Sequence, residues 1–471
     1  MGNVGISFGS PTSGQGFDVS TTVSQIVANL QAIETPWKNQ LSSLQSQDTA
    51  LSSISTDLSS LSTALESLTD FEGVLSEKEG SSSDTSVLEI TNASSTAVAG
   101  SHTVVVTQLA TTDSQYSGDL GAADSLTGSL IINGKTITIS NGSTQDGNGH
   151  TIPANDTVST LASYINSGNY GVTAEVYPDG ASSRLALVSN TGGAGGNIAI
   201  DSSNLTNTTT GNGITFTDSE KNGAQDAIFS VDGIPRTSPT NTVTTGIPGI
   251  TFQLLSQAPN ESVQVEITND NSAVESAVGS FVSAYNTVMK DLNSQEGNDA
   301  SGNAEPLYGN PTTALLQEQL QSALNFAQSS GAITSLTQLG ITASASDDGT
   351  LTLNSSALDA VLNSNYQDVI NFFQPSGAFK SFGGNLSSVL NNLSNTAPFG
   401  AIYLALQQNS SAESQLNTSI TNENATISAE QSQLTTELNE ANYTLQSIPS
   451  QLQEVNEMYS AITGYNENSN G

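Results

Sequence analysis

The sequence predicts an α+β multidomain protein: long terminal coiled-coil helices and a helical domain form a stalk, with an inserted β-rich head of two small domains. Three observations support this fold class. Apolar residues recur every three or four positions at both ends of the chain, the period changes to two in the middle, and the helical period returns after Ala273. With 471 residues, of which 35% are hydrophobic, the chain can build several cores.

The N-terminal stripe follows a Gly-, Ser- and Pro-rich stretch, residues 1–17, which we expect to be disordered in isolation. From Val19 to Leu68, apolar residues recur mostly at steps of three and four, as in a coiled-coil seam. The phase slips around Pro36, which predicts two helices. Thr35 is expected to cap the second helix, with Pro36 at its first position, where a missing N–H costs nothing.

The C-terminal stripe runs from Leu416 to Ile462 at heptad-compatible spacing, and Pro449 is expected to kink or divide it. Residues 36–72 and 412–447 would each form a helix about 55 Å long, given a rise of roughly 1.5 Å per residue. Their matching lengths favour an antiparallel pairing.

These stripes need partners, because each seam Leu or Ile left in water forgoes roughly 1.5 to 3 kcal/mol. The partner could be the other end of the same chain, as in an intramolecular stalk, or another subunit. We expect the terminal helices, here called the legs, to be marginal or disordered in a monomer and to order on assembly. The residues expected at the interface with a partner are Ile26, Leu30, Trp37, Leu41, Leu452, Val455 and Tyr459.

Between the legs the apolar pattern becomes that of strands. The expected strands lie in residues 87–91, 102–110, 227–236, 246–255 and 262–268. This β-rich region ends near Asp270, and because it interrupts the two legs it should form a head on a helical stalk.

Two tight hairpins and one short helix are expected inside this region. Asn133-Gly134 accepts the positive φ values that a type I′ turn requires. Pro178-Asp179-Gly180 supplies turn chemistry between two strand-like segments. The helix should begin at Thr157 with Asp156 as its cap.

After Ala273 the helical pattern returns in residues 273–292, 312–327 and 356–373. A hairpin around Asp347-Asp348-Gly349 is expected before the last of these helices. The predicted domains are a disordered tail (1–17), N-terminal leg and stalk helices (18–78), the first β segment of the head domain (79–120), an inserted outer head domain of α+β type (121–220), the second β segment of the head domain (221–271), a helical stalk domain with a β-hairpin (272–400), and C-terminal stalk and leg helices (401–471).

Composition excludes several classes of function. Eight Lys and Arg against 44 Asp and Glu give a net charge of −36, which repels phosphate backbones and anionic membranes, so nucleic acid is not expected as a partner. The chain has no cysteine, which excludes disulfides, thiolate metal sites and thiol nucleophiles. We also expect no secretory signal peptide at the start and no membrane insertion, because no apolar run approaches the roughly 20 residues of a spanning helix.

No residue pattern indicates catalysis, so we expect no enzymatic activity and no cofactor. The two histidines, His102 and His150, lack a partner pattern for a metal or a catalytic triad. The loop of residues 141–150 has oxygen ligands at intervals that could suit calcium, but it lacks the bidentate Glu of an EF-hand loop, and a solvated hairpin tip is preferred. Residues 191–197 are expected to be a flexible glycine-rich connector.

Four segments, spread in order over most of the chain, resemble the flagellar filament cap family, also called hook-associated protein 2. They are GFDVSTTVSQIVANLQAIETPW near the N-terminus, SVLEITNASSTAVAGSHTVVVTQLA, AQDAIFSVDGIPRTSPTNTVTTGIPGITFQLL, and LGITASASDDGTLTLNSSALDAVL. The resemblance implies an extracellular protein at the flagellum tip, exported by the flagellar type III apparatus without a cleaved signal peptide. It further implies a homo-oligomeric ring with flagellin, a hook-associated junction protein and a cytoplasmic chaperone at the C-terminal helix as partners.

Two other functions stay open at this point. A hook–filament junction protein or a flagellin-like axial protein also carries terminal helices, although the β pattern around Val231-Asp232-Gly233 argues against it. A surface adhesin with a glycan-binding β head is the alternative from a different class. One departure from the family pattern is the C-terminal segment, which has no basic residue after Lys380.

Overall fold

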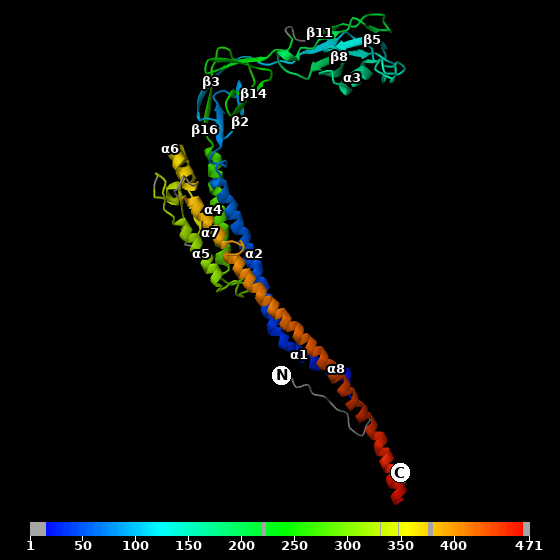
Figure 1. The fold of residues 1–471 in the computed structure, drawn as a ribbon, viewed down its shortest axis with the longest axis vertical. Coiled ribbons are helices and arrows are strands. Elements are labelled where there is room, and N and C mark those ends of the chain that lie inside the picture. Colours follow the sequence, from blue (N-terminus) through cyan, green and yellow to red (C-terminus); the bar gives the residue numbers. More distant parts are fainter. Residues whose placement is uncertain (1–15, 219–222, 330, 347, 375–379, 465–471) are drawn as a thin grey trace. The chain divides into compact units, whose positions relative to one another are not determined.

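The structure, a computed structural model, describes residues 16–218, 223–329, 331–346, 348–374 and 380–464. It consists of two compact units (Figure 1). The β unit is Asp70–Val274, and the helical unit combines the chain up to Thr69 with the chain from Glu275 onward. The predicted α+β class, with helical ends and a β-rich middle, is confirmed.

The helical unit contains long helices from both ends of the chain and a group of shorter elements. Its elements are α1 (Val19–Gln31), η1 (Ala32–Glu34), α2 (Thr35–Thr69), most of α4 (Asn271–Ser294), α5 (Pro311–Leu324), η3 (Leu336–Leu339), β17 (Ile341–Ala343), β18 (Leu351–Leu353), α6 (Ser355–Phe373), α7 (Phe382–Leu393) and α8 (Ala401–Thr463). The three helices expected after Ala273 are confirmed as α4, α5 and α6, whereas α7 was not expected. The expected hairpin is the antiparallel β17–β18 pair; Asp347 of its turn lies outside the described residues.

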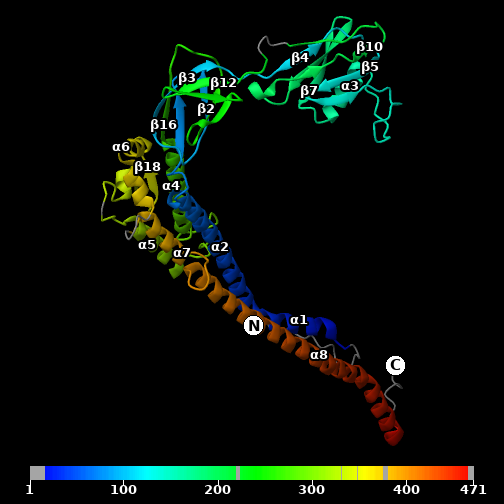
Figure 2. The ribbon, with the colours of Figure 1, turned by 45° about the horizontal axis from the view of Figure 1, so that its top comes forward.

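The two legs pair in antiparallel fashion, as predicted. Asn409 on α8 donates its side-chain amide to Asp48 on α2 at 2.7 Å, and the Phe17 N–H donates to Asn442 at 2.9 Å. Rising residue numbers on one leg therefore meet falling numbers on the other, and Figures 1 and 2 show α1 and α2 running beside α8.

The break in the N-terminal leg is confirmed, but its cap is not. The short 3₁₀ turn η1 separates α1 from α2, so two helices form where the phase of the stripe slips. Thr35 has helical backbone angles (φ −53°, ψ −45°), so it is the first residue of α2 and not an extended cap as predicted. Pro36 still lies in the first turn, where its missing N–H has no partner to lose.

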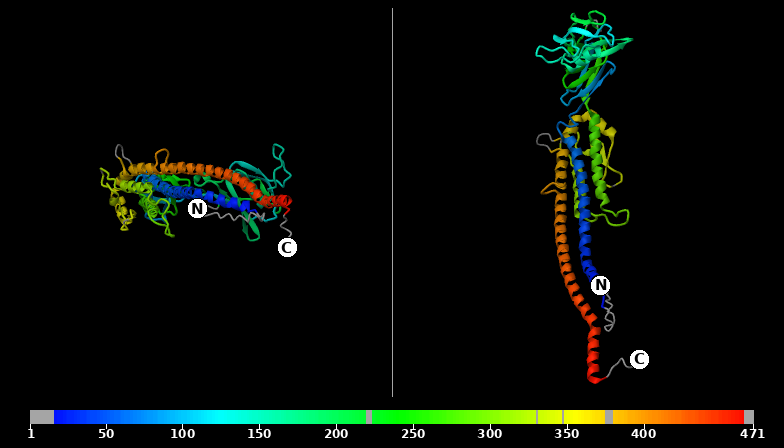
Figure 3. Two further views of the ribbon diagram at one scale, coloured as in Figure 1. Left: turned by 90° about the horizontal axis from the view of Figure 1, so that it is seen from below. Right: turned by 90° about the vertical axis from the view of Figure 1, so that its right-hand side faces the viewer.

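Pro449 does not divide the C-terminal leg. The sequence predicts a kink or a division at Pro449, and of these two the division is wrong, because α8 is one helix of 63 residues that contains this proline. The helix curves along its length (Figure 3).

Apolar side chains are buried along the second half of α2, from Leu51 to Leu68. Six seam residues are 0–2% exposed; we call them the packed seam: Leu51, Ile54, Leu58, Leu61, Leu65 and Leu68. The rings of Phe372 on α6 and Phe382 on α7 stack with centroids 5.0 Å apart. α7 also approaches α6 closely, since a Cβ on Gly383 would come within 2.2 Å of the Phe373 carbonyl oxygen.

One core of the β unit lies between two antiparallel sheets. The five-stranded sheet has the order β1-β16-β3-β12-β13, and the three-stranded sheet has the order β14-β15-β2. Their strands are β1 (Lys78–Ser82), β2 (Leu88–Ala93), β3 (Gly100–Gln108), β12 (Ala227–Val231), β13 (Ile234–Ser238), β14 (Thr242–Ile247), β15 (Ile250–Leu254) and β16 (Val263–Asn269). Alternate residues of both sheets bury the core, with Phe229 and Phe252 in edge-to-face contact at 5.9 Å.

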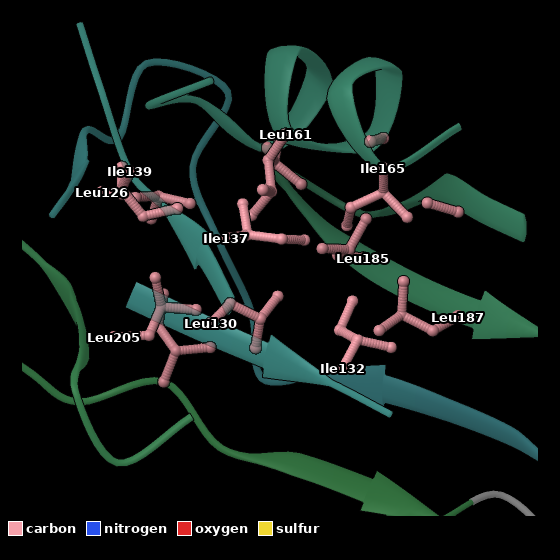
Figure 4. Close-up of a cluster of buried hydrophobic side chains, with 14 of the residues drawn as sticks. Leu126, Leu130, Ile132, Ile137, Ile139, Leu161, Ile165, Leu185, Leu187 and Leu205 are labelled. Atoms are coloured by element: carbon pink, nitrogen blue, oxygen red, sulfur yellow. The ribbon is translucent and has the colours of Figure 1, made fainter. Parts of the chain in front are cut away.

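The second core of the β unit is formed by residues 114–218. Its sheets have the orders β10-β5-β6, with β9 also pairing with β5, and β11-β4-β8-β7. The elements are β4 (Ser114–Ser117), β5 (Leu126–Ile132), β6 (Lys135–Thr138), α3 (Val158–Ser167), β7 (Val172–Asp179), β8 (Ser182–Ser189), η2 (Ala194–Gly196), β9 (Ile200–Asp201), β10 (Leu205–Asn207) and β11 (Phe216–Asp218). Figure 4 shows Leu161 and Ile165 of α3 pointing into this core toward Ile137 and Leu185.

Turn chemistry in the β unit follows the predictions closely. Asn133 and Gly134 have φ of 49° and 77° between β5 and β6, as the type I′ turn requires. The β7–β8 hairpin turns directly after Asp179, with Gly180 at φ 66°.

Two local predictions in the β unit are wrong. The cap of α3 is Thr157 and not Asp156, because Thr157 and Thr160 form a reciprocal capping box. Residues 191–197 are not an open connector: they contain η2, and a Cβ on Gly196 would come within 2.0 Å of the Thr191 carbonyl oxygen.

Candidate interface along the terminal helices

The four predicted interface residues of the N-terminal leg are half-buried within the chain itself. Ile26 and Leu30 lie on α1, and Trp37 and Leu41 lie on the first turns of α2. Both helices contact α8. The intramolecular partner that the sequence left open therefore applies to this leg, because α8 lies beside both helices.

The three predicted residues of the C-terminal leg are exposed. Leu452, Val455 and Tyr459 are 43%, 54% and 57% exposed, and Met458 and Ile462 extend the same apolar surface at 60% and 78%. We call these five residues the C-terminal stripe. Steps of three and four place them along one side of α8.

Among the described residues, the antiparallel pairing of the legs ends before the C-terminal stripe begins. Phe17 meets Asn442, so the described part of the N-terminal leg ends opposite that residue. α8 continues to Thr463, and the stripe begins ten residues past Asn442, the acceptor of the Phe17 N–H. The structure thus does not bring the two groups of predicted interface residues together.

Polar contacts limit like-charge repulsion between the two legs, both of which carry more acidic than basic residues. Asp48 faces an amide donor, Asn409, and not a carboxylate. The glutamates of α8 that follow Ile427, from Glu430 to Glu457, are exposed, where water and salt screen them. At the start of α1, the Thr21 hydroxyl and N–H hydrogen-bond to Asp18 and lower the pKa of that capping carboxyl.

Sequence reasoning missed an ion pair between a buried Glu34 and an exposed Lys38 at the break between α1 and α2. Glu34 is 0% exposed, and Lys38 Nζ lies 2.7 Å from its Oε2. The spacing of four residues was the available signal. Lys38 is the one cation of the N-terminal leg. Its charge offsets the buried carboxylate of Glu34 within the same leg.

The other chemical candidates are polar contacts of turns. His102 Nδ1 lies 2.7 Å from Asp232 Oδ2, and hydrogen bonds from His102 and from the Thr103 N–H lower the pKa of Asp232. In the 141–150 loop, Asp146 accepts the N–H groups of Asn148 and His150, which lowers its pKa. The described residues contain no cluster of three or more potential metal-ligating side chains, and no helix among them is apolar over a length that would cross a bilayer.

Comparison with known families gives three matches along the chain. Residues 224–466, more than half of the sequence, match the C-terminal region of flagellar hook-associated protein 2, and residues 15–113 match its N-terminal region. Residues 130–191 match a flagellin hook IN motif.

Curated relatives agree with these matches. The B-type flagellar hook-associated protein 2 of Pseudomonas aeruginosa is 27% identical over 60% of this chain and 63% of its own length. The A-type protein from the same species is 26% identical over 76% of this chain and 78% of its own length. The chain therefore spans somewhat less than two thirds of the first relative and more than three quarters of the second.

A solved structure shares the fold. The structure described as the flagellar cap protein FliD D1-D2-D3 domains from Escherichia coli matches with a TM-score of 0.53 and 24% identity. It covers 77% of this chain and 99% of the solved chain.

Proposed function

This chain belongs to the flagellar hook-associated protein 2 family, and from that premise we propose that it caps the distal end of a bacterial flagellar filament. In this role it forms a homo-oligomeric ring that promotes the folding and insertion of exported flagellin subunits. The role is structural and involves no covalent chemistry. The Escherichia coli structure with the same fold is described as a flagellar cap protein, which supports the proposal.

The observation that carries the proposal is the bare C-terminal stripe. Five large apolar side chains lie along one side of α8 past the end of the described intrachain pairing. Burying a Leu, Val or Met side chain is worth roughly 1.5 to 3 kcal/mol. A surface of this kind on a soluble chain marks a contact with another protein, and a neighbouring subunit or a filament subunit supplies it.

The remaining partners and the location belong to the same proposal. The protein acts outside the cell at the flagellum tip, after export by the flagellar type III apparatus. Flagellin and a hook-associated junction protein are its partners in the filament. Before export, a cytoplasmic chaperone covers the C-terminal helix, and the stripe is the surface that needs covering.

A double variant tests the role of the legs. Leu30→Asp combined with Val455→Asp places a charge in each leg, and we expect cells that carry it to lose motility and filament growth while the β unit stays folded. The matched control is Ala28→Asp with Gln453→Asp, which adds the same charge at exposed positions of the same helices. Normal swimming by the Leu30→Asp, Val455→Asp cells would reject the proposal.

Because Leu30 is half-buried against its own chain, the single Val455→Asp variant separates assembly from folding. Its side chain is 54% exposed, so folding should be unaffected while filament growth falls. Antibody labelling by electron microscopy tests the location, with label expected at filament tips. Label along the shaft would indicate a flagellin-like axial protein instead.

A further inference from the structure

A buried carboxyl group lies within the packed seam of α2. Asp57 directly precedes Leu58 and is half-buried, and its Oδ2 has no contact with solvent and no hydrogen-bond donor in the described chain. An ionised carboxylate in such a position is costly, because burial removes its water without supplying a donor. Asp57 is not among the proposed interface residues of the legs.

The neighbour of Asp57 is a second carboxyl group, Asp291 on α4. Burial, and after it the hydrogen-bonding and charge interactions with Asp291, raise the pKa of Asp57 to about 6. Two carboxylates only accept hydrogen bonds, so a bond between them requires a proton on one of them. The pair is therefore favourable with one proton and repulsive with none.

In the described part of the chain, no cation forms an ion pair with these two carboxyl groups. Neither Asp57 nor Asp291 forms an ion pair with a Lys, Arg or His in the part of the chain that the structure describes. The ionisable side chains on the surrounding elements are Lys38, Asp48 and Glu66 on α2, Glu275, Tyr285 and Lys290 on α4, Glu318 on α5 and Tyr403 on the first turn of α8, whereas α7 has none. Lys290 precedes Asp291 in sequence but is not among the groups that shift the pKa of Asp57.

We propose that Asp57 and Asp291 form a proton-dependent clasp between α2 and α4 that tightens the helical unit in mildly acidic conditions and loosens it at neutral pH. This inference does not depend on the capping function. The folded chain binds the proton more tightly than the unfolded chain, in which Asp57 has its ordinary pKa near 3.8. The stabilisation is therefore complete below about pH 3.8 and is lost as the pH rises through about 6.

Asp57→Asn tests the clasp, since an amide replaces the carboxylate and is uncharged at every pH. Unfolding in urea is followed by the fluorescence of Trp37, the single tryptophan, which lies on the same helix. At pH 7.5 the variant should unfold with an equilibrium constant lower than that of the unsubstituted chain, by at most roughly a hundredfold for a shift of about two pKa units and by less where solvent screens the pair. The advantage should shrink as the pH falls toward 4.5.

Matched variants remove the effects of net charge. Glu66→Gln removes one exposed charge from the same helix and should show no advantage that disappears between pH 7.5 and 4.5. Asp291→Asn should reproduce Asp57→Asn, and the double variant should gain little more than either single variant, because one substitution already relieves the repulsion. An advantage for Asp57→Asn that is absent at pH 7.5, or unchanged at pH 4.5, would overturn the clasp.

A direct titration keeps the proposal testable even if a variant fails to fold. Carbon-13 NMR of the aspartate carboxyl groups in the full chain should show one carboxyl with a midpoint near pH 6 that is absent from the Asp57→Asn spectrum. A midpoint near 4 for Asp57 would overturn the proposal. So would a selective stabilisation of the unsubstituted chain by calcium or magnesium chloride at pH 7.5, because the pair would then hold a cation and not a proton.

Discussion

The packed seam of α2 and the C-terminal stripe of α8 have the same sequence pattern and opposite surroundings. Both repeat large apolar residues at steps of three and four. The packed seam is 0–2% exposed, whereas the C-terminal stripe is 43–78% exposed. The period of a stripe therefore predicts a helix with an apolar side, but it does not say which molecule covers that side.

The residues of the N-terminal leg lie between these extremes. Leu30 and Leu41 are half-buried because α8 lies along one side of α1 and of the first half of α2. The second half of α2 also contacts α7, and its packed seam is buried. Burial thus has three levels, from the packed seam through the half-buried N-terminal leg to the tip of α8, and the effects of substitutions on stability should follow the same order.

The largest effect is expected in the packed seam. Leu61 is 0% exposed, so Leu61→Ala removes buried apolar contacts and leaves a cavity, which costs about 2 to 5 kcal/mol in the free energy of unfolding of the helical unit. Urea unfolding followed by Trp37 fluorescence measures this loss. A loss below about 1 kcal/mol would mean that the seam is not packed as described.

An intermediate effect on the free energy of unfolding is expected in the first half of α2. Leu41→Ala removes a side chain that is only half covered, so the loss should be about 1 kcal/mol, since roughly half of the apolar area leaves water on folding. The same urea experiment provides the comparison. If Leu41→Ala costs as much as Leu61→Ala, α8 covers the N-terminal leg more completely than the described exposure indicates.

The smallest effect on folding is expected at the tip of α8. Val455→Asp with Tyr459→Asp changes two exposed side chains, so the free energy of unfolding of the isolated chain should stay within about 0.5 kcal/mol of its original value. Thermal unfolding followed by circular dichroism at low protein concentration checks this. A large loss of stability would show that the stripe is covered within its own chain.

Much of the architecture could be predicted from local patterns. The type I′ turn at Asn133-Gly134 was predictable because those two residue types tolerate positive φ, and the antiparallel legs were predictable from their matching lengths. Local rules failed where two groups compete for one role. Thr157 and not Asp156 caps α3, because Thr160 completes a capping box with it.

Long-range contacts were out of reach of the sequence. Nothing in the stretch from Lys78 to Ser82 reads as a strand, and it becomes β1 only because β16 pairs with it from nearly 190 residues away. Of the candidate site, the helices and their apolar sides were predictable, but the place on α8 where the described pairing ends was not. That end point decides which stripe residues stay bare.

The central claim is that assembly, and not folding, covers the C-terminal stripe. The chain has no native cysteine, so a single nitroxide spin label can be placed at Val455→Cys, with Gln453→Cys, also exposed on α8, as the matched control. Electron paramagnetic resonance spectra are then compared for the monomer and for the assembled protein. We expect the label at position 455 to be mobile in the monomer and immobilised on assembly, with little change at position 453. A label at 455 that stays mobile in the assembled protein, or is already immobilised in the monomer, would contradict the account.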